Sequence, residues 1–198
     1  MRLILASGSP RRAGLLRQIG LDFEISAPDV DESRYPDEEP VLYVERIARA
    51  KVEGLAAADV VVVAGDTAVV HEGKVLGKPA HPEEARGMLR RLQGNTHDVM
   101  TGVAVASLSS NEVVVRTLVD VTEVEMLAMT GDEIADYVAT GEPLDKAGAY
   151  ALQGIGGRFV KRVWGSPSTV IGLPLHLLPR LFDAVGSDLS MFAKGRSG

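Results

Sequence analysis

Apolar and polar positions follow two patterns along this chain. Short apolar runs, bounded by glycine, proline or charged residues, predict strands, whereas apolar residues spaced three and four apart predict amphipathic helices. The predicted strands are residues 3–6, 23–26, 60–64, 67–71, 74–76, 99–107 and 113–125. The predicted helices are residues 10–20, 40–51, 82–92, 130–140 and 174–184. Because strands alternate with helices, the sequence predicts an α/β fold.

The sequence predicts a long hairpin, which argues against a purely parallel sheet. Its arms, residues 99–107 and 113–125, are joined through Ser109, Ser110 and Asn111. Hairpin arms pair antiparallel, which predicts a mixed sheet. We therefore expect a mixed, elongated sheet flanked by helices, in two lobes with a central cleft.

Composition sets the number of domains. The 198 residues are 45% hydrophobic and 24% charged, which suits one globular domain, or two closely packed lobes, with a real core. Residues 1–185 are predicted to form this single two-lobed domain. Residues 186–198 turn polar and are expected to form a flexible tail.

Charge and cysteine content narrow the class of protein. The net charge of -6 argues against broad binding to nucleic acid or to an anionic membrane, so an anionic ligand must meet a local basic cluster. The lack of cysteine excludes thiolate zinc sites and cysteine nucleophiles. Because the apolar start is too short for a signal peptide and no apolar run reaches about 18 residues, the chain is expected to be cytoplasmic.

A turn of small residues, SGSPRR at positions 7–12, leads into the first predicted helix. Small side chains let backbone N–H groups approach a ligand, and the helix N-terminus adds partial positive charge. Arg11 and Arg12 would offer their guanidinium forks to phosphate oxygens. The segment indicates a phosphate cradle, although an ordinary capped helix with two solvated arginines accounts for it as well.

Asp66 follows the most apolar of the predicted strands. The run at residues 60–64 is β-branched, which predicts a strand buried on both faces. A carboxylate at the carboxyl end of such a strand lies where open α/β sheets place their ligand crevice, and it can hold a divalent ion or orient water. The alternative is an aspartate that opens a turn after Gly65.

Three other charged residues are candidates for a phosphate or metal site. Lys78 is held in a loop between Gly77 and Pro79, unlike the freely moving lysine of a helix surface. Glu32, in an acidic loop, could give magnesium a second carboxylate. Lys51 lies near the end of a predicted helix. Each has a plainer alternative, which is solvation for Lys78 and Glu32 and complementing the helix dipole for Lys51.

Several other chemistries lack their motifs in this sequence. It contains no Walker loop, no dinucleotide fingerprint and no nucleophile elbow. Its histidines are scattered without metal-ligand spacing, at His71, His81, His97 and His176. A phosphate cradle, several cations and one or two carboxylates together are what phosphoryl or nucleotidyl transfer needs.

Five motifs, in order, resemble the pattern of the Maf family of nucleoside triphosphate pyrophosphatases. They are Ser7 to Arg12, Gly65-Asp66-Thr67, Leu76-Gly77-Lys78-Pro79, Thr101-Gly102-Val103 and GEPLDKAGAYALQG at residues 141–154. The similarity extends through residues 171–175, so it covers nearly the whole chain apart from the tail. One departure is Gly14, which stands where the family often has glutamate and should cost the helix about 1 kcal/mol relative to alanine.

The resemblance implies a fold similar to the inosine triphosphate pyrophosphatases and frequently a homodimer. It also implies hydrolysis between the α and β phosphates with a divalent cation, Mg²⁺ or else Mn²⁺ or Co²⁺. Asp66 matches the general base or metal-orienting carboxylate, and Glu32 the acidic metal-side residue. The residues that match phosphate contacts are Ser7, Ser9, Arg11, Arg12, Lys51 and Lys78.

The base preference follows from three further matches. Arg11, Thr67 and Gln153 match the branch that prefers thymidine and uridine triphosphates and modified pyrimidine nucleotides. The amide of Gln153 offers both a donor and an acceptor, as the imide edge of uracil or thymine requires. Without the resemblance, Gln153 reads as a surface glutamine before a glycine turn.

The resemblance therefore predicts a house-cleaning enzyme that hydrolyses dTTP and UTP to the monophosphate and pyrophosphate. Two rival hypotheses remain. One is a nucleotide-binding regulator of septum formation without turnover. The other is a pyrophosphatase with broader action on deaminated purine triphosphates.

Overall fold

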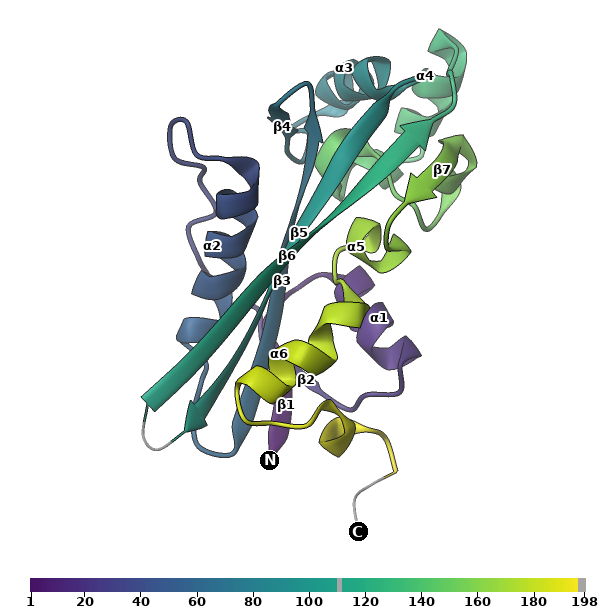
Figure 1. Cartoon of the computed structure of the whole chain (residues 1–198). Coiled ribbons are helices and arrows are strands. Elements are labelled where there is room, and N and C mark those ends of the chain that lie inside the picture. The colour runs from purple at the N-terminus through teal and green to yellow at the C-terminus, as the bar shows by residue number, and fades with distance from the viewer. Residues whose placement is uncertain (110–111, 196–198) are drawn as a thin grey trace. The chain divides into compact units, whose positions relative to one another are not determined.

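The computed structural model describes residues 1–109 and 112–195 and has an α/β fold with a mixed sheet, as the sequence predicts (Figure 1). The strands are β1 (Arg2–Leu5), β2 (Glu24–Ile25), β3 (Val60–His71), β4 (Lys74–Leu76), β5 (Thr96–Ser109), β6 (Glu112–Met126) and β7 (Val160–Trp164). Their order in the sheet is β2-β1-β3-β5-β6-β7, and β4 pairs with β3. Pairing is parallel between β1 and both β2 and β3, and antiparallel between β3 and β4 and between β6 and β7.

Helices flank this sheet, and most of them begin at a proline. The α-helices are α1 (Pro10–Gln18), α2 (Pro40–Glu53), α3 (Pro82–Leu92), α4 (Gly131–Ala139), α5 (Pro167–Ile171) and α6 (Leu178–Ala184). Proline suits the first turn because its missing N–H would have no helical partner there. The side chain of Ser9 caps α1, and Thr130 forms a capping box with Glu133 at the start of α4. Both caps are those that the sequence predicts.

The chain divides into two compact units. Unit 1 comprises the described residues of Met1–Asp66, Thr101–Asp120 and Gly172–Gly198, and unit 2 those of Thr67–Met100 and Val121–Ile171. Strands β3, β5 and β6 each contribute residues to both units. Among the described residues, no helix combines the length and the apolar character that a membrane crossing requires.

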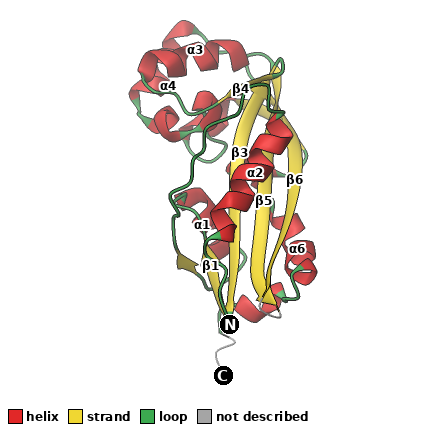
Figure 2. Ribbon diagram, turned by 90° about the vertical axis from the view of Figure 1, so that its left-hand side faces the viewer, coloured by secondary structure: helices red, strands yellow, loops and turns green. Residues whose placement is uncertain are grey.

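In unit 1, helix α2 lies against the sheet (Figure 2). Small and β-branched residues of α2, β3 and β5, among them Ala48, Val62 and Ala104, form a buried cluster. A Cβ atom at Gly102 of β5 would lie 2.4 Å from the backbone oxygen of Val44 in α2, so only glycine allows this approach. This close packing fixes the helix that carries Lys51.

Unit 2 has its own core. Helices α3 and α4 pack together there, over apolar residues of the unit 2 parts of β3, β5 and β6 (Figure 1). Tyr137 of α4 is almost fully buried, and its ring lies 5.6 Å from that of Phe159, centroid to centroid. The hydroxyl end of Tyr137 is therefore held inside the unit by the packing of its ring.

The structure corrects one expectation that concerns a functional residue. Asp66 does not follow a strand that ends at residue 64, because β3 runs without a break from Val60 to His71. A Cβ atom at Gly65 would lie 3.2 Å from the backbone oxygens of both Gly102 and Gly172. The glycine therefore marks a close approach within a strand and not the end of one.

The last third of the chain differs from expectation in two places. Strand β7 and helix α5 were not predicted, because residues 157–171 contain no apolar run. Within the expected tail, residues Leu189–Phe192 form a 3-10 helix, and Phe192 is buried against Phe182 of α6. In the predicted turn of the long hairpin, Ser110 and Asn111 lie outside the described residues.

Candidate functional site

Ser7 and Ser9 form the entry to helix α1 in unit 1. Ser7 is buried, and its Oγ accepts hydrogen bonds from Ser9 N at 3.2 Å and from Arg12 Nη1 at 3.0 Å. Ser9 Oγ accepts a longer hydrogen bond from Arg12 N at 3.5 Å. The two serines thus shape the turn and orient Arg12, while Arg11 lies beside them, partly exposed.

Arg12 is fixed from a second direction. Its Nε donates to the backbone oxygen of Gly172 at 2.8 Å. Burial lowers the pKa of the Arg12 guanidinium, and Arg11 lowers it further, whereas the negative charges of Asp66 and Glu32 raise it. Arg12 therefore carries its charge within the field of both carboxylates, which offset part of the cost of its burial.

Lys51 joins the two carboxylates. Its Nζ lies 2.8 Å from Asp66 Oδ1 and 2.7 Å from Glu32 Oε1. Lys51 and Asp66 are only 6% and 8% exposed, whereas the side chain of Glu32 is 47% exposed. Lys51 was predicted either to bind phosphate or to complement a helix dipole, and the structure gives it this buried ion pair.

The electrostatics of Asp66 follow from its position. Burial raises the pKa of the Asp66 carboxyl, since a charged carboxylate is poorly solvated inside the protein. Lys51 and Arg12 oppose this effect and Glu32 adds to it, and the net result is a raised pKa. A carboxylate with raised proton affinity suits a general base, because that affinity lies closer to neutral pH.

Two residues of α2 that sequence reasoning missed hold the loop that carries Glu32. The Tyr43 hydroxyl donates to the backbone oxygen of Glu32 at 3.0 Å. Arg46 binds both carboxylate oxygens of Glu38, at 2.6 and 2.8 Å, and its Nη2 also donates to the backbone oxygen of Ser33 at 2.9 Å. Tyr43 and Arg46 are three residues apart on α2 and therefore lie on the same face of the helix. This spacing is the one signal in the sequence that could have indicated that they contact the same loop.

Three of the predicted site residues belong to unit 2. Thr67 follows Asp66 in β3 and is partly exposed. Lys78 is exposed in the loop after β4, and that loop is tied to another motif because Gly148 N donates to Gly77 O at 3.1 Å. Gln153 is exposed on the segment before the 3-10 helix Ile155–Phe159. Unit 1, in contrast, brings Ser7, Ser9, Arg12, Glu32, Lys51 and Asp66 together.

Two carboxylates of unit 1 are candidate ligands for a hard divalent cation. Among the described residues, no group of three or more His, Cys, Asp or Glu side chains could hold a metal ion. Glu32 and Asp66 nevertheless both direct an oxygen to the same Lys51 Nζ. Magnesium commonly uses one or two carboxylates and takes its other ligands from water and substrate phosphates, so this pair suits it.

Comparison with known proteins gives closely related sequences. The sequence model of a family described as "Maf-like protein" matches residues 2–185. A protein of Anaeromyxobacter dehalogenans named dTTP/UTP pyrophosphatase is 53% identical over 188 residues, which cover 95% of this chain and 96% of the relative. Proteins of the same name from Methylobacillus flagellatus and Vibrio cholerae are 48% and 47% identical, covering 93% and 88% of this chain and 93% of each relative.

A search of solved structures gives a more distant likeness. The Staphylococcus aureus Ham1 protein is similar with a TM-score of 0.41 and 18% sequence identity, over 75% of this chain and 85% of that chain.

Proposed function

Because this chain belongs to the Maf family, we propose that it is a nucleoside triphosphate pyrophosphatase that hydrolyses dTTP and UTP to the monophosphate and pyrophosphate. The names of its close relatives support this substrate class. The observation that carries the proposal is the buried ion pair of Lys51 and Asp66, within the field of the anchored Arg12. Such a site can meet a polyphosphate with positive charge and still hold a carboxylate for water.

The family resemblance assigns phosphate contacts to residues of each unit. In unit 1, Ser7 and Ser9 offer the start of a helix, and Arg11, Arg12 and Lys51 offer charge. In unit 2, Thr67 and Lys78 are assigned to substrate binding by the family resemblance. The side chain of Thr67 is partly exposed and that of Lys78 is exposed.

A divalent cation, Mg²⁺ or else Mn²⁺ or Co²⁺, would be held by Glu32 and Asp66. When bound, it would neutralise phosphate charge and polarise the phosphorus–oxygen bond that breaks. Tyr43 and Arg46 support this arrangement, because they fix the loop on which Glu32 is carried.

The reaction is attack of water on the α phosphorus. A new oxygen–phosphorus bond forms, the bond from the α phosphorus to the bridging oxygen breaks, and pyrophosphate leaves with the electron pair. Asp66 either takes the proton of the attacking water or would mainly serve to hold the cation. Arg12 and Lys51 stabilise the negative charge that gathers on the phosphates.

Gln153 selects the base, in this proposal, by pairing its amide with the imide edge of uracil or thymine. A site built to hydrogen-bond one edge rejects a base that leaves its polar groups unpaired. The same reading extends to modified pyrimidine triphosphates that keep this edge intact.

The partners follow from charge and family. The family supports a small-molecule substrate, and the net charge of -6 argues against nucleic acid or an anionic membrane as partner. The lack of cysteine supports a cytoplasmic enzyme. The resemblance supports a homodimer, which light scattering of the purified chain tests directly.

One assay separates this proposal from its rivals. Purified protein with Mg²⁺ is incubated with dTTP, UTP, methylguanosine triphosphate and inosine triphosphate, and monophosphate and pyrophosphate are quantified. We expect equal amounts of both products from dTTP and UTP, and none after chelation of the metal. Binding without turnover favours the regulator, and preference for inosine triphosphate favours the broader enzyme. Release of a single phosphate would refute cleavage between the α and β phosphates.

A further inference from the structure

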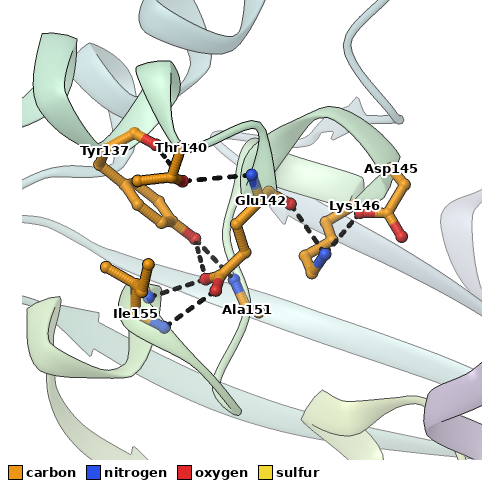
Figure 3. A network of polar contacts seen from close by, with 8 residues as sticks. Tyr137, Thr140, Glu142, Asp145, Lys146, Ala151 and Ile155 are labelled. Carbon is orange, nitrogen blue, oxygen red and sulfur yellow. Dashed lines mark hydrogen bonds and ion pairs between the residues drawn. The ribbon is translucent and has the colours of Figure 1, made fainter.

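Glu142 of unit 2 lies at the centre of a polar network that the proposed reaction does not use (Figure 3). Its Oε1 accepts hydrogen bonds from the Tyr137 hydroxyl and from Gly156 N, both at 2.8 Å. Its Oε2 accepts one from Ile155 N at 2.9 Å. The Tyr137 hydroxyl in turn accepts a hydrogen bond from Ala151 N at 3.3 Å. Glu142 and Tyr137 thus hold both ends of the segment 151–156.

Two glycines of this segment, Gly154 and Gly156, lie so close to the side chains of Glu142 and Tyr137 that a Cβ atom would not fit. Gly154 has φ of 111° and ψ of -156°, a conformation that is essentially restricted to glycine. A Cβ atom there would lie 2.5 Å from Glu142 Oε2, and one at Gly156 would lie 2.2 Å from the Tyr137 hydroxyl. The backbone of the segment is therefore pressed against the carboxylate and the phenol.

Tyr137 and Glu142 are themselves held in place by burial and by hydrogen bonds. Tyr137 is almost fully buried in α4, and Glu142 is anchored through its own backbone. Its N–H donates to Thr140 Oγ1 at 3.2 Å, and its carbonyl oxygen accepts from Lys146 Nζ at 2.8 Å (Figure 3). Movement of the carboxylate would disturb contacts on both sides.

Glu142 is ionised in this setting. Burial alone would raise the pKa of its carboxyl, but the hydrogen bonds from Gly156, Ile155 and Tyr137 together outweigh it, and the pKa is lowered. Hydrogen bonds to a charged acceptor are about twice as strong as neutral ones. The contacts of Glu142 therefore order the segment more firmly than neutral turn contacts would.

Gln153 lies in the middle of this segment, with its side chain exposed. We propose that Glu142 and Tyr137 are positioning residues that fix the 151–156 backbone and so aim the Gln153 amide at the base. This inference rests on the proposed function, in which Gln153 reads the pyrimidine edge. A donor and an acceptor discriminate between bases only when their directions are held.

The first test compares two glutamate variants of the same unit. Glu142→Gln replaces one acceptor oxygen by an NH₂ group that faces a backbone N–H. The matched control is Glu133→Gln. Among the described residues, the Glu133 carboxylate accepts hydrogen bonds only from Thr130 N and Thr130 Oγ1, within the cap of α4. Hydrogen–deuterium exchange should be at least tenfold faster across 151–156 in Glu142→Gln and unchanged there in Glu133→Gln. Unchanged exchange in Glu142→Gln would overturn the inference whatever the activity.

The second test measures base selectivity. The ratio of kcat/KM for UTP to that for methylguanosine triphosphate should fall about tenfold in Glu142→Gln, mainly through KM for UTP, and less in Tyr137→Phe. An equal loss on all triphosphates would indicate a merely structural role and overturn the positioning role.

A mutant cycle separates this inference from the proposed function. If Glu142 acts through Gln153, adding Glu142→Gln to Gln153→Ala should not lower the selectivity ratio further. A further fall of the ratio in the double variant would refute the positioning role. So would wild-type selectivity in Glu142→Gln when Gln153→Ala has lost it. Either result would leave the proposed function intact. Failure of the wild-type protein to hydrolyse any pyrimidine triphosphate would refute the proposed function instead, and the exchange measurement would still decide whether Glu142 orders the segment.

Discussion

Lys51 holds its ammonium 2.8 Å from the buried carboxylate of Asp66, and its positive charge lowers the proton affinity that burial raises. Burial raises the pKa of Asp66, and Lys51 limits this rise. The pair gives the candidate site both a cation for phosphate and a base for water.

Asp66→Asn should remove most of the turnover. The amide cannot accept a proton from water, and loss of a general base costs about 10²- to 10⁴-fold in rate. Because asparagine keeps an oxygen at the Oδ1 position for Lys51, thermal unfolding should stay close to that of the wild type. Pyrophosphate release from dTTP measures the effect, and near-normal turnover in a folded variant would remove Asp66 from the mechanism.

Lys51→Met should move the acid limb of the pH–rate profile to higher pH. Lys51 lowers the pKa of Asp66 by attraction, so its removal lets burial raise that pKa further, and a higher pH is needed to ionise the base. Loss of Lys51 can also lower the maximal rate, because Lys51 is proposed to bind phosphate. The pH at which the rate falls to half still reports the pKa of Asp66. Lys51→Arg keeps the charge and serves as the control, in which the limb should stay near that of the wild type.

Gly102→Ala should destabilise the fold, whereas Gly14→Ala should stabilise it. A Cβ atom at Gly102 would meet the Val44 backbone at 2.4 Å, and such overpacking costs about 1–3 kcal/mol or more. A Cβ atom at Gly14 meets nothing within 4 Å, and alanine gains up to about 1 kcal/mol over glycine in a helix. Denaturant midpoints compare the two variants, and equal effects would contradict the close approach of α2 to β5.

His97 should make stability depend on pH below neutrality. Burial lowers its pKa to about 4, and His71 adds to this effect. The ring lies against Tyr150, with Nε2 2.8 Å from the hydroxyl oxygen, and Nδ1 has no hydrogen-bond partner within the described residues. An unfolded histidine binds a proton near pH 6.5, so acidification from there towards pH 4 favours unfolding.

The expected loss of stability from His97 is at most about 3 kcal/mol at pH 4. His97→Gln lacks the titrating ring, so the difference in free energy of unfolding between wild type and variant should shrink as the pH falls from 6.5 to 4. Chemical denaturation at several pH values measures it. A difference that does not change with pH would contradict the burial of a neutral ring.

Much of the fold could be predicted because local signals agree with it. Helix α3 has the predicted bounds, Pro82–Leu92, since proline marks its start and apolar spacing its length. Strand β3 shows where local reasoning fails. Gly65 reads as a break in sequence, but its cause is the approach of backbone from residues 102 and 172, which no local pattern reveals.

The sequence predicted which residues belong to the candidate site better than it predicted how they contact one another. The residues came from motifs and resemblance, because a single lysine or glutamate carries no signal of what it contacts. The pairing of Lys51 with both Glu32 and Asp66 depends on how α2 packs on the sheet. Tyr43, Arg46 and Glu142 were missed because several of their partners are backbone groups, which look alike at every position of a sequence.

The hydrogen bond from Arg12 to Gly172 joins positions 160 residues apart. During translation, Arg12 leaves the ribosome long before its carbonyl partner at Gly172 has been synthesised. A polypeptide that ended before this residue would lack the bond that fixes the Arg12 guanidinium from a second direction. The doubly anchored form of Arg12 therefore exists only in chains that extend at least to residue 172.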